Sequence, residues 1–166
     1  KGDLRIDTRH LPLPMREGAD AAARAYLAAA RQGKHLEFGE GLFGATAIGR
    51  ETFLQIARQA GLEPARFLRD FDDPAIGKQV EADIALARQL GVSGTPAMFV
   101  NGRFVDGLQG LGTYAAMVRE ELNRAEQFAK SGTPAAALHA ALMSDALPQS
   151  KFPNPVLPEE GTGVSA

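Results

Sequence analysis

A short apolar segment between two turn signals is the strongest constraint on how this chain folds. Residues 97–100 (Ala-Met-Phe-Val) are apolar at every position, which is typical of a strand covered on both faces of a sheet. Asn101 and Gly102 follow, and both residue types accept the positive φ of a two-residue type I′ turn. Residues 103–108 are then expected to return antiparallel. The sequence therefore predicts a β-hairpin whose first strand is central in its sheet.

The entry to this strand is formed by Gly94, Thr95 and Pro96. Proline lacks a ladder donor, which is tolerable at the first position of a strand, and glycine allows the backbone an unusual approach. X–Pro bonds are cis in roughly 5 to 6% of cases. The local sequence by itself therefore favours a trans bond between Thr95 and Pro96.

The composition indicates one globular domain with a real core. The chain has 166 residues, of which 45% are hydrophobic and 23% charged, and its net charge is -2. Its 18 basic side chains against 20 acidic ones leave no excess for gripping phosphates, and no basic stripe contains interleaved aromatics. No apolar run approaches the roughly 20 residues of a membrane span, and no signal peptide is recognisable. We therefore expect neither nucleic acid nor a membrane as a partner.

The absence of cysteine narrows the chemistry further. Disulfides, thiolate metal sites and cysteine nucleophiles are excluded together for these 166 residues. The three scattered histidines, His10, His35 and His139, lack the spacing of metal ligands. His10 follows a strand signal and is expected to face solvent, so we assign it no role. The sequence predicts no metal site, no cofactor and no catalytic residue.

Helical patterns fill most of the remaining chain. A short strand is predicted at 4–8, ahead of two prolines that forbid a longer ladder. The spacing of apolar residues predicts helices at 19–31, 36–43, 51–60, 64–71, 74–87, 114–128 and 134–142. Gly, Pro and Asp residues mark the helix boundaries, and Asp73 is one of the expected caps. From residue 147 onward, prolines interrupt a segment without periodicity. That segment is interpreted as an extended tail or a linker.

Several polar and aromatic residues are interpreted as structural. Tyr114 and Phe128 fall on a stripe at helical spacing and are expected in the core. The neighbouring Glu120 and Glu121 are expected on a solvated helix face. The glycine-rich stretch at 107–112 lacks the lysine and the spacing of a phosphate loop, so it is interpreted as a flexible turn.

Four separated pieces of sequence carry a resemblance to a known family. They are residues 4–13 (LRIDTRHLPL), residues 32–43 with Gln-Gly-Lys at their start and Leu-Phe at their end, residues 59–62 (QAGL), and residues 90–102 with LGVSGTP and Asn-Gly. In order and spacing they make the chain resemble the DsbA-like branch of the thioredoxin superfamily. The resemblance covers most of the chain.

This resemblance implies an α/β, thioredoxin-like fold with a helical insertion domain. Residues 1–14 and 91–130 would form the thioredoxin-like part, and residues 15–90 the helical insertion. Residues 131–146 would form a C-terminal helix, and residues 147–166 a Pro-rich tail or linker.

The resemblance also implies a site and a location. Gly94, Thr95 and Pro96 would form the cis-proline loop, and the Thr95 backbone would pair with an extended peptide or protein substrate. A location in the periplasm, or otherwise outside the cytoplasm, follows from the same resemblance.

The chain departs from the family pattern at one place. A family member is expected to carry a further strand and a Cys-X-X-Cys helix before the position that matches Lys1, and neither is present. The missing strand would normally lie between strands 4–8 and 97–100. Such a gap exposes ladder donors and acceptors unless another segment fills it. The candidates are an upstream segment, a second copy in a strand-sharing homodimer, or residues 152–157 folding back.

Three functions remain open. The first is a DsbA-like thiol-disulfide oxidoreductase domain, here a fragment without its cysteine pair. It would be redox-inert as given, since exchange needs a thiolate and a resolving thiol. The second is a non-catalytic thioredoxin-like module that binds peptides or proteins. The third is a glutathione-dependent isomerase, for which Val rather than Thr95 is expected before the proline. The first is the leading hypothesis.

Overall fold

A computed structural model of the chain describes residues 4–144. The chain divides into two compact units, which we term the helical unit (Ile6–Ala87) and the hairpin unit (Lys1–Arg5 with Arg88–Ala166). The helical unit begins inside the segment that the resemblance assigns to the thioredoxin-like part. The expected tail at 147–166 lies outside the described residues, as does the end of the helix expected to reach residue 146.

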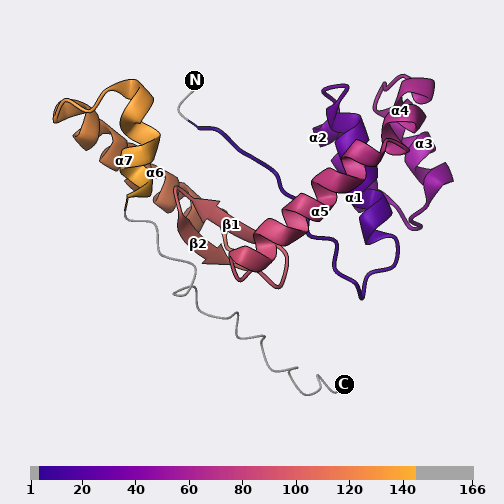
Figure 1. The fold of residues 1–166 in the computed structure, drawn as a ribbon, viewed down its shortest axis with the longest axis horizontal. Coiled ribbons are helices and arrows are strands. Elements are labelled where there is room, and N and C mark those ends of the chain that lie inside the picture. The colour runs from indigo at the N-terminus through magenta and orange to yellow at the C-terminus, as the bar shows by residue number, and fades with distance from the viewer. Residues whose placement is uncertain (1–3, 145–166) are drawn as a thin grey trace, which may run out of the picture. The chain divides into compact units, whose positions relative to one another are not determined.

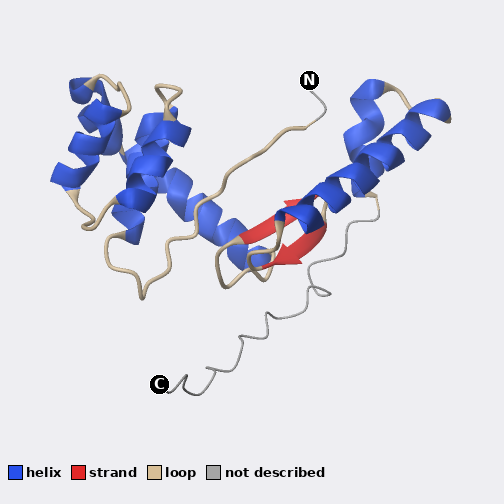
Figure 2. Ribbon diagram, turned by 180° about the vertical axis from the view of Figure 1, so that it is seen from behind, coloured by secondary structure: helices blue, strands red, loops and turns tan. Residues whose placement is uncertain are grey.

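Five helices begin in the helical unit, as the sequence predicts (Figures 1 and 2). They are α1 (Ala19–Ala30), α2 (His35–Gly44), α3 (Arg50–Gln59), α4 (Pro64–Phe71) and α5 (Pro74–Gln89). The short α2 forms although glycine is a poor helix former and occupies three of its positions. Packing against α1 and α3 compensates for that low propensity.

Side-chain caps determine where α4 and α5 begin. The Glu63 carboxylate accepts hydrogen bonds from the backbone N–H groups of Ala65 (2.8 Å) and Arg66 (2.6 Å). Asp73 Oδ1 accepts a hydrogen bond from the N–H of Ala75 (2.9 Å), so the predicted Asp73 cap is confirmed. A proline opens each of these helices, at a position where no intrahelical donor is needed.

Phenylalanines from α2, α3 and α4 form the centre of the apolar core. Phe38, Phe53 and Phe67 are each at most 1% exposed, and the Phe38 and Phe67 ring centroids lie 5.4 Å apart. Phe71 extends this cluster, with its ring centroid 5.8 Å from that of Phe53. Small side chains of α1, such as the fully buried Ala28, let that helix approach the rings closely. The helical unit therefore contains a continuous apolar core of its own.

The hairpin unit contains the predicted hairpin. β1 (Ala97–Val100) pairs antiparallel with β2 (Arg103–Asp106). Asn101 (φ 46°) and Gly102 (φ 80°) form the turn, so the type I′ prediction is confirmed. β2 ends at Asp106, before the expected residue 108, because Gly107 adopts φ 64° and turns the chain out of the ladder.

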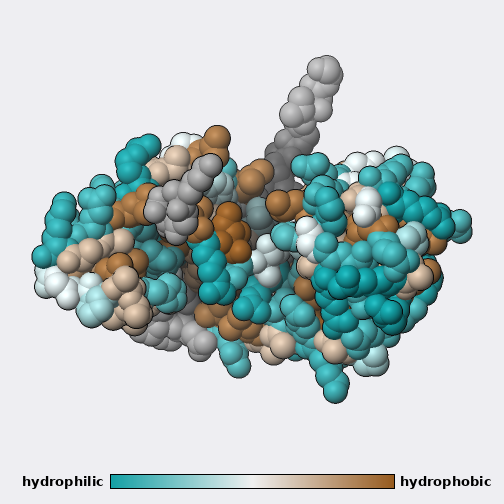
Figure 3. Space-filling view, turned by 90° about the horizontal axis from the view of Figure 1, so that it is seen from above, coloured by the Kyte–Doolittle hydropathy of each residue, from teal (hydrophilic) through white to brown (hydrophobic). Residues whose placement is uncertain are grey.

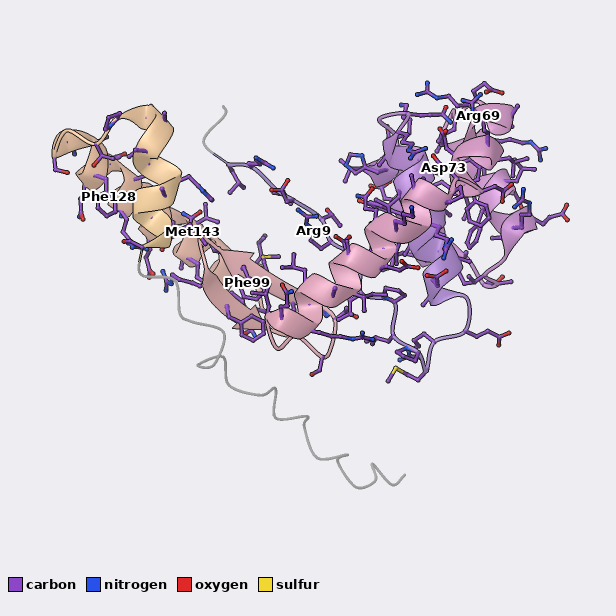
Figure 4. The ribbon with its side chains drawn as sticks, viewed as in Figure 1. Arg9, Arg69, Asp73, Phe99, Phe128 and Met143 are labelled. Atoms are coloured by element: carbon purple, nitrogen blue, oxygen red, sulfur yellow. The ribbon has the colours of Figure 1, made fainter. Side chains whose placement is uncertain are left out.

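The hairpin is followed by α6 (Leu111–Lys130), a 3₁₀ turn at Ala135–Ala137 and α7 (Leu138–Met143). Figure 4 marks Phe128 on α6 and Met143 at the end of α7. Gly132 adopts φ 92° just after α6, as expected of a glycine that closes a helix. The N–H of Thr133 donates to the carbonyl of Phe128 (2.9 Å) at this helix end.

The predicted strand at 4–8 is wrong. Residues 4–8 form no strand, and Leu4 (59%) and Ile6 (79%) are exposed. The expectation of a central strand at 97–100 also fails for the described residues, where β1 belongs to a two-stranded sheet. A strand needs a neighbour to complete its ladder, and the alternating pattern at 4–8 cannot form one without it.

The predicted core stripe on α6 is also wrong. Tyr114 and Phe128 are half-buried, Leu122 is 38% exposed, and the one buried residue of this helix is Glu121. Tyr114 instead ties down the loop at 107–112, since its hydroxyl donates to the carbonyl of Gly107 (3.3 Å). It also accepts from the N–H of Gln109 (3.0 Å). That loop is therefore anchored rather than a flexible turn.

Candidate functional site

The loop that enters β1 is the strongest candidate site. Its Thr95–Pro96 peptide bond is cis, as the family resemblance implies and against the preference of the local sequence. Thr95 and Pro96 are exposed, whereas Gly94 is half-buried. Within the described residues, neither the N–H nor the carbonyl of Thr95 has a hydrogen-bond partner. The loop therefore presents main-chain groups that an extended ligand can pair with.

Rings on the hairpin hold the strand behind this loop. Phe99 faces Phe104 across the two strands, with ring centroids 5.0 Å apart. Such cross-strand aromatic pairs stabilise a sheet by about 0.5–1 kcal/mol. Val105 on β2, which lies opposite Met98 in the ladder, is 7% exposed. The candidate loop thus leads directly into a strand that is paired with its neighbour.

A buried carboxylate joins the hairpin turn to α6, and sequence reasoning missed it. Glu121 is 3% exposed, contrary to the prediction of a solvated face. Its carboxylate accepts hydrogen bonds from Asn101 Nδ2 (3.1 Å), Arg103 Nη1 (3.2 Å) and Arg124 Nη1 (2.9 Å). Glu120, its neighbour, is exposed and pairs with Arg103 at 2.7 Å. The two adjacent glutamates therefore have different roles.

The electrostatics of Glu121 follow from these partners. Burial raises the pKa of this carboxyl, but hydrogen bonds from Asn101, Arg124 and Arg103 outweigh burial and hold the pKa below its usual range. Glu121 is therefore ionised at neutral pH and fixes the turn of the hairpin against the helix. No local signal in the sequence predicts this burial, because the partners Asn101 and Arg103 come from the hairpin rather than from α6.

His10 lies in a fixed polar setting, contrary to the prediction of a solvent-facing residue. The backbone N–H of His10 donates to Asp83 Oδ2 (3.0 Å), and Nη1 of Arg9 (Figure 4) donates to Asp83 Oδ1 (3.2 Å). The His10 ring meets the ring of Tyr26 edge-on at 5.0 Å, and its Nε2 is buried without a hydrogen-bond partner. Burial lowers the pKa of His10, and the charge of Asp83 opposes that shift. Asp83 is too distant in sequence for any spacing rule to predict this contact.

Other site classes find no support in the described part of the chain. No group of three His, Asp or Glu side chains in residues 4–144 is placed to hold a metal ion. Across the same residues, no helix has both the length and the apolar character needed to cross a bilayer.

Comparison with solved structures defines the class of fold. The chain is similar to a thioredoxin-like oxidoreductase from Silicibacter pomeroyi DSS-3, with a TM-score of 0.57 and 36% sequence identity. The match covers 66% of this chain and 64% of that chain. Together with the hairpin, its entry loop and the helices of the two units, it shows a thioredoxin-like α/β fold.

Comparison with protein families narrows the class to one family. Residues 4–118 match the DSBA-like thioredoxin domain, so the chain belongs to that family. The chain is also 38% identical over 117 residues to a protein named Na⁺/H⁺ antiporter NhaA from Herminiimonas arsenicoxydans. That match covers 70% of this chain but 18% of the relative, so the chain spans less than a fifth of the relative's length.

Proposed function

We propose that these 166 residues are the substrate-holding part of a DsbA-like thiol-disulfide oxidoreductase domain, and that Gly94, Thr95 and Pro96 hold an extended polypeptide. One observation carries the proposal. The Thr95 main chain is exposed and unpaired where the backbone enters β1. An extended peptide laid against such a segment gains main-chain hydrogen bonds, as in other cases of strand addition.

The proposed activity of these residues is binding and does not include thiol-disulfide exchange. Exchange needs an attacking thiolate and a second thiol that resolves the mixed disulfide, and the sequence contains no cysteine. The chain alone is therefore inert in disulfide exchange while it still binds polypeptides. A cysteine pair would have to come from outside these residues. The family resemblance supports a periplasmic or otherwise extracytoplasmic location for this activity.

A second candidate function is a non-catalytic peptide-binding module. The similarity to a stretch of a protein named as an antiporter supports it, because a domain carried within a transporter has no evident need of a redox pair. In this case the loop binds a polypeptide for recognition alone. Assay of the complete gene product separates the two functions: dithiol oxidation indicates the oxidoreductase, and binding without oxidation indicates the module.

We also propose that a further segment covers the hairpin unit. Met98 (43%), Leu111 (83%) and Leu122 (38%) are exposed apolar side chains of this unit, and brown hydrophobic residues reach the surface in Figure 3. An upstream segment or a second copy in a strand-sharing homodimer would cover them and complete the ladder of β1. The mass of the chain in solution tests the second-copy arrangement. A monomer in which residues 4–8 pair directly with β1 would contradict the proposed gap.

The binding proposal is tested by titrating the ¹⁵N-labelled chain with a reduced, carboxymethylated and therefore thiol-free polypeptide. We expect saturable shifts of the backbone amides at residues 93–95 and 97, since Pro96 has no N–H. Thr95→Val keeps the main chain and should bind within about threefold of the wild type, because recognition is through the backbone. Absence of shifts at 93–97 would contradict the proposal. An insulin-reduction assay should stay at background, and turnover without cysteine would favour the isomerase.

A further inference from the structure

The helical unit contains a groove of about 260 Å³ that no part of the proposed function uses. One wall is made of small residues from the end of α2 and the segment that follows it: Gly41, Gly44, Ala45 and Ala47. The other wall is a row of uncharged polar side chains on α3: Thr52, Gln55 and Gln59. Thr46 and Ile56 also line the groove.

Two glycines of α2 give the groove its shape. A Cβ at Gly41 would lie 2.5 Å from Cγ2 of Ile56, so glycine is required for α2 to pack this closely on α3. A Cβ at Gly44 would meet no atom within 4 Å, because the space above it is open. The backbone of α2 is thus open at Gly44, where another main chain can approach it closely.

The polar wall has unused hydrogen-bonding capacity. Thr52, Gln55 and Gln59 are spaced three and four residues apart, so they share one face of α3. In the described part of the chain, none of these side chains has a hydrogen bond or an ion pair. Each carboxamide offers two donors and an acceptor, which matches the alternating N–H and C=O groups of a peptide backbone.

The same chain shows how a glutamine recognises an extended backbone. The Gln32 carboxamide accepts a hydrogen bond from the N–H of Glu63 (2.9 Å) and donates one to the carbonyl of Glu63 (3.3 Å). Glu63 has extended geometry, with φ -76° and ψ 115°. Gln55 and Gln59 carry the same carboxamide and line the open groove. Each can therefore form the same pair of hydrogen bonds with the N–H and the carbonyl of one extended residue.

Charge and size restrict what the groove accepts. No charged side chain lines it, so a charged ligand group would lose water there without gaining an ionic partner. At about 260 Å³ the groove is smaller than the roughly 300–1,000 Å³ of sites that enclose a compact ligand. It suits a short stretch of a longer chain.

We propose that the α2–α3 groove binds an extended, uncharged polypeptide segment, and that the carboxamides of Gln55 and Gln59 pair with its main chain. The site lies wholly in the helical unit and is independent of the loop at Gly94, Thr95 and Pro96. An experiment can therefore refute binding at this groove while binding at the loop holds. It can equally refute binding at the loop while binding at the groove holds.

The test is a titration of the full ¹⁵N-labelled chain with a capped, uncharged peptide rich in Ser, Thr and Val. A second peptide replaces alternate residues with Glu and Lys. We expect saturable shifts in residues 44–59 with the uncharged peptide, and at least tenfold weaker binding of the charged peptide at this groove. The variant Gln55→Ala/Gln59→Ala should weaken binding at the groove at least tenfold, since each substitution removes a bidentate contact. Gln79→Ala, on the exposed surface of α5, is the matched control and should change nothing.

Equal affinities of the double variant and the wild type would overturn the proposal, provided that their thermal unfolding midpoints agree. Equal binding of the two peptides at the groove would overturn it as well. Shifts confined to residues 93–97 would overturn the groove and leave the proposed function in place. Shifts confined to residues 44–59 would support the groove and contradict the proposed loop site.

Discussion

The two units of this chain are organised on opposite principles. The helical unit buries a continuous apolar cluster in which Phe38, Phe53 and Phe67 are almost fully enclosed. Among the described residues of the hairpin unit, the buried hydrophobic side chains are Val105 and Leu142. What ties β1, β2 and α6 together there is the carboxylate of Glu121 with its three hydrogen-bond donors.

This difference shows which unit is self-sufficient. Apolar burial is the main favourable term in folding, at about 25 cal/mol per Å² removed from water. A hydrogen-bonded ion cluster contributes far less net stability, because its groups must first be desolvated. The helical unit therefore supplies its own stability. In the hairpin unit, polar contacts hold β1, β2 and α6 together, and several apolar side chains stay exposed. These exposed side chains are the physical reason for proposing a covering segment.

The largest expected effect comes from removing the centre of the apolar core. Phe67→Ala deletes a ring that is 0% exposed and packs on Phe38, so it should cost about 3–5 kcal/mol of unfolding free energy. Phe43→Ala is the matched control. Its ring is 97% exposed, and its loss should change stability by less than about 0.5 kcal/mol. Urea titration of both variants checks this, and similar costs for the two would refute the assignment of the core.

The next effect should be confined to the hairpin unit. Glu121→Gln removes the charge that Asn101, Arg103 and Arg124 surround, and should weaken the protection of amides in β1 and α6 by about 2 kcal/mol. Glu120→Gln is the control, because its exposed pair with Arg103 is worth less than about 1 kcal/mol. Hydrogen exchange of the two variants is the measurement. An equal loss of protection in α1 and α4 would show that the units do not act separately.

The stability that the Glu121 carboxylate contributes depends on pH with a definite sign. The folded-state pKa of Glu121 lies below its usual value, so the carboxylate stabilises the fold at pH above the unfolded pKa of 4.5. That contribution is lost as pH falls through the lower, folded-state pKa. In Glu121→Gln the acid-induced loss of protection in α6 should therefore be smaller than in the wild type. An unchanged acid profile would refute the role of this carboxylate.

The smallest effect concerns His10 in the helical unit. Burial depresses its pKa below 6.5, so the unfolded chain binds more protons than the folded chain in that range. Stability should be complete above about pH 6.5 and should decline as the pH falls from there towards the folded-state pKa. His10→Phe keeps the ring against Tyr26 and should flatten this part of the profile. His139→Phe, at an exposed position, should leave the profile unchanged.

Local signals predicted most of the elements correctly. The Asp73 cap, the Asn101–Gly102 turn and the glycine that ends α6 each act within a few residues, so the sequence around them is sufficient. The strand at 4–8 failed because a strand depends on a neighbour that the local pattern does not supply.

The candidate sites differ in the same way. Thr95 and Pro96 are candidates because a motif carries them, and their role in binding stays a prediction. Glu121 could not, since its burial depends on Asn101 and Arg103, which reach it from another element. The polar row of Gln55 and Gln59 has the spacing of an ordinary solvated face, and only the bare end of α2 opposite it makes a groove.

Native-state hydrogen exchange on the full chain tests the central claim, that the helical unit is self-sufficient and the hairpin unit is not. Amides in the middle of α1, α3 and α4 should exchange only through global unfolding. Amides in β1, β2 and α6 should open locally, with protection lower by at least about 2.7 kcal/mol, which is roughly a hundredfold in rate. Equal protection in the two units would contradict the account and show a single cooperative structure that needs no further segment.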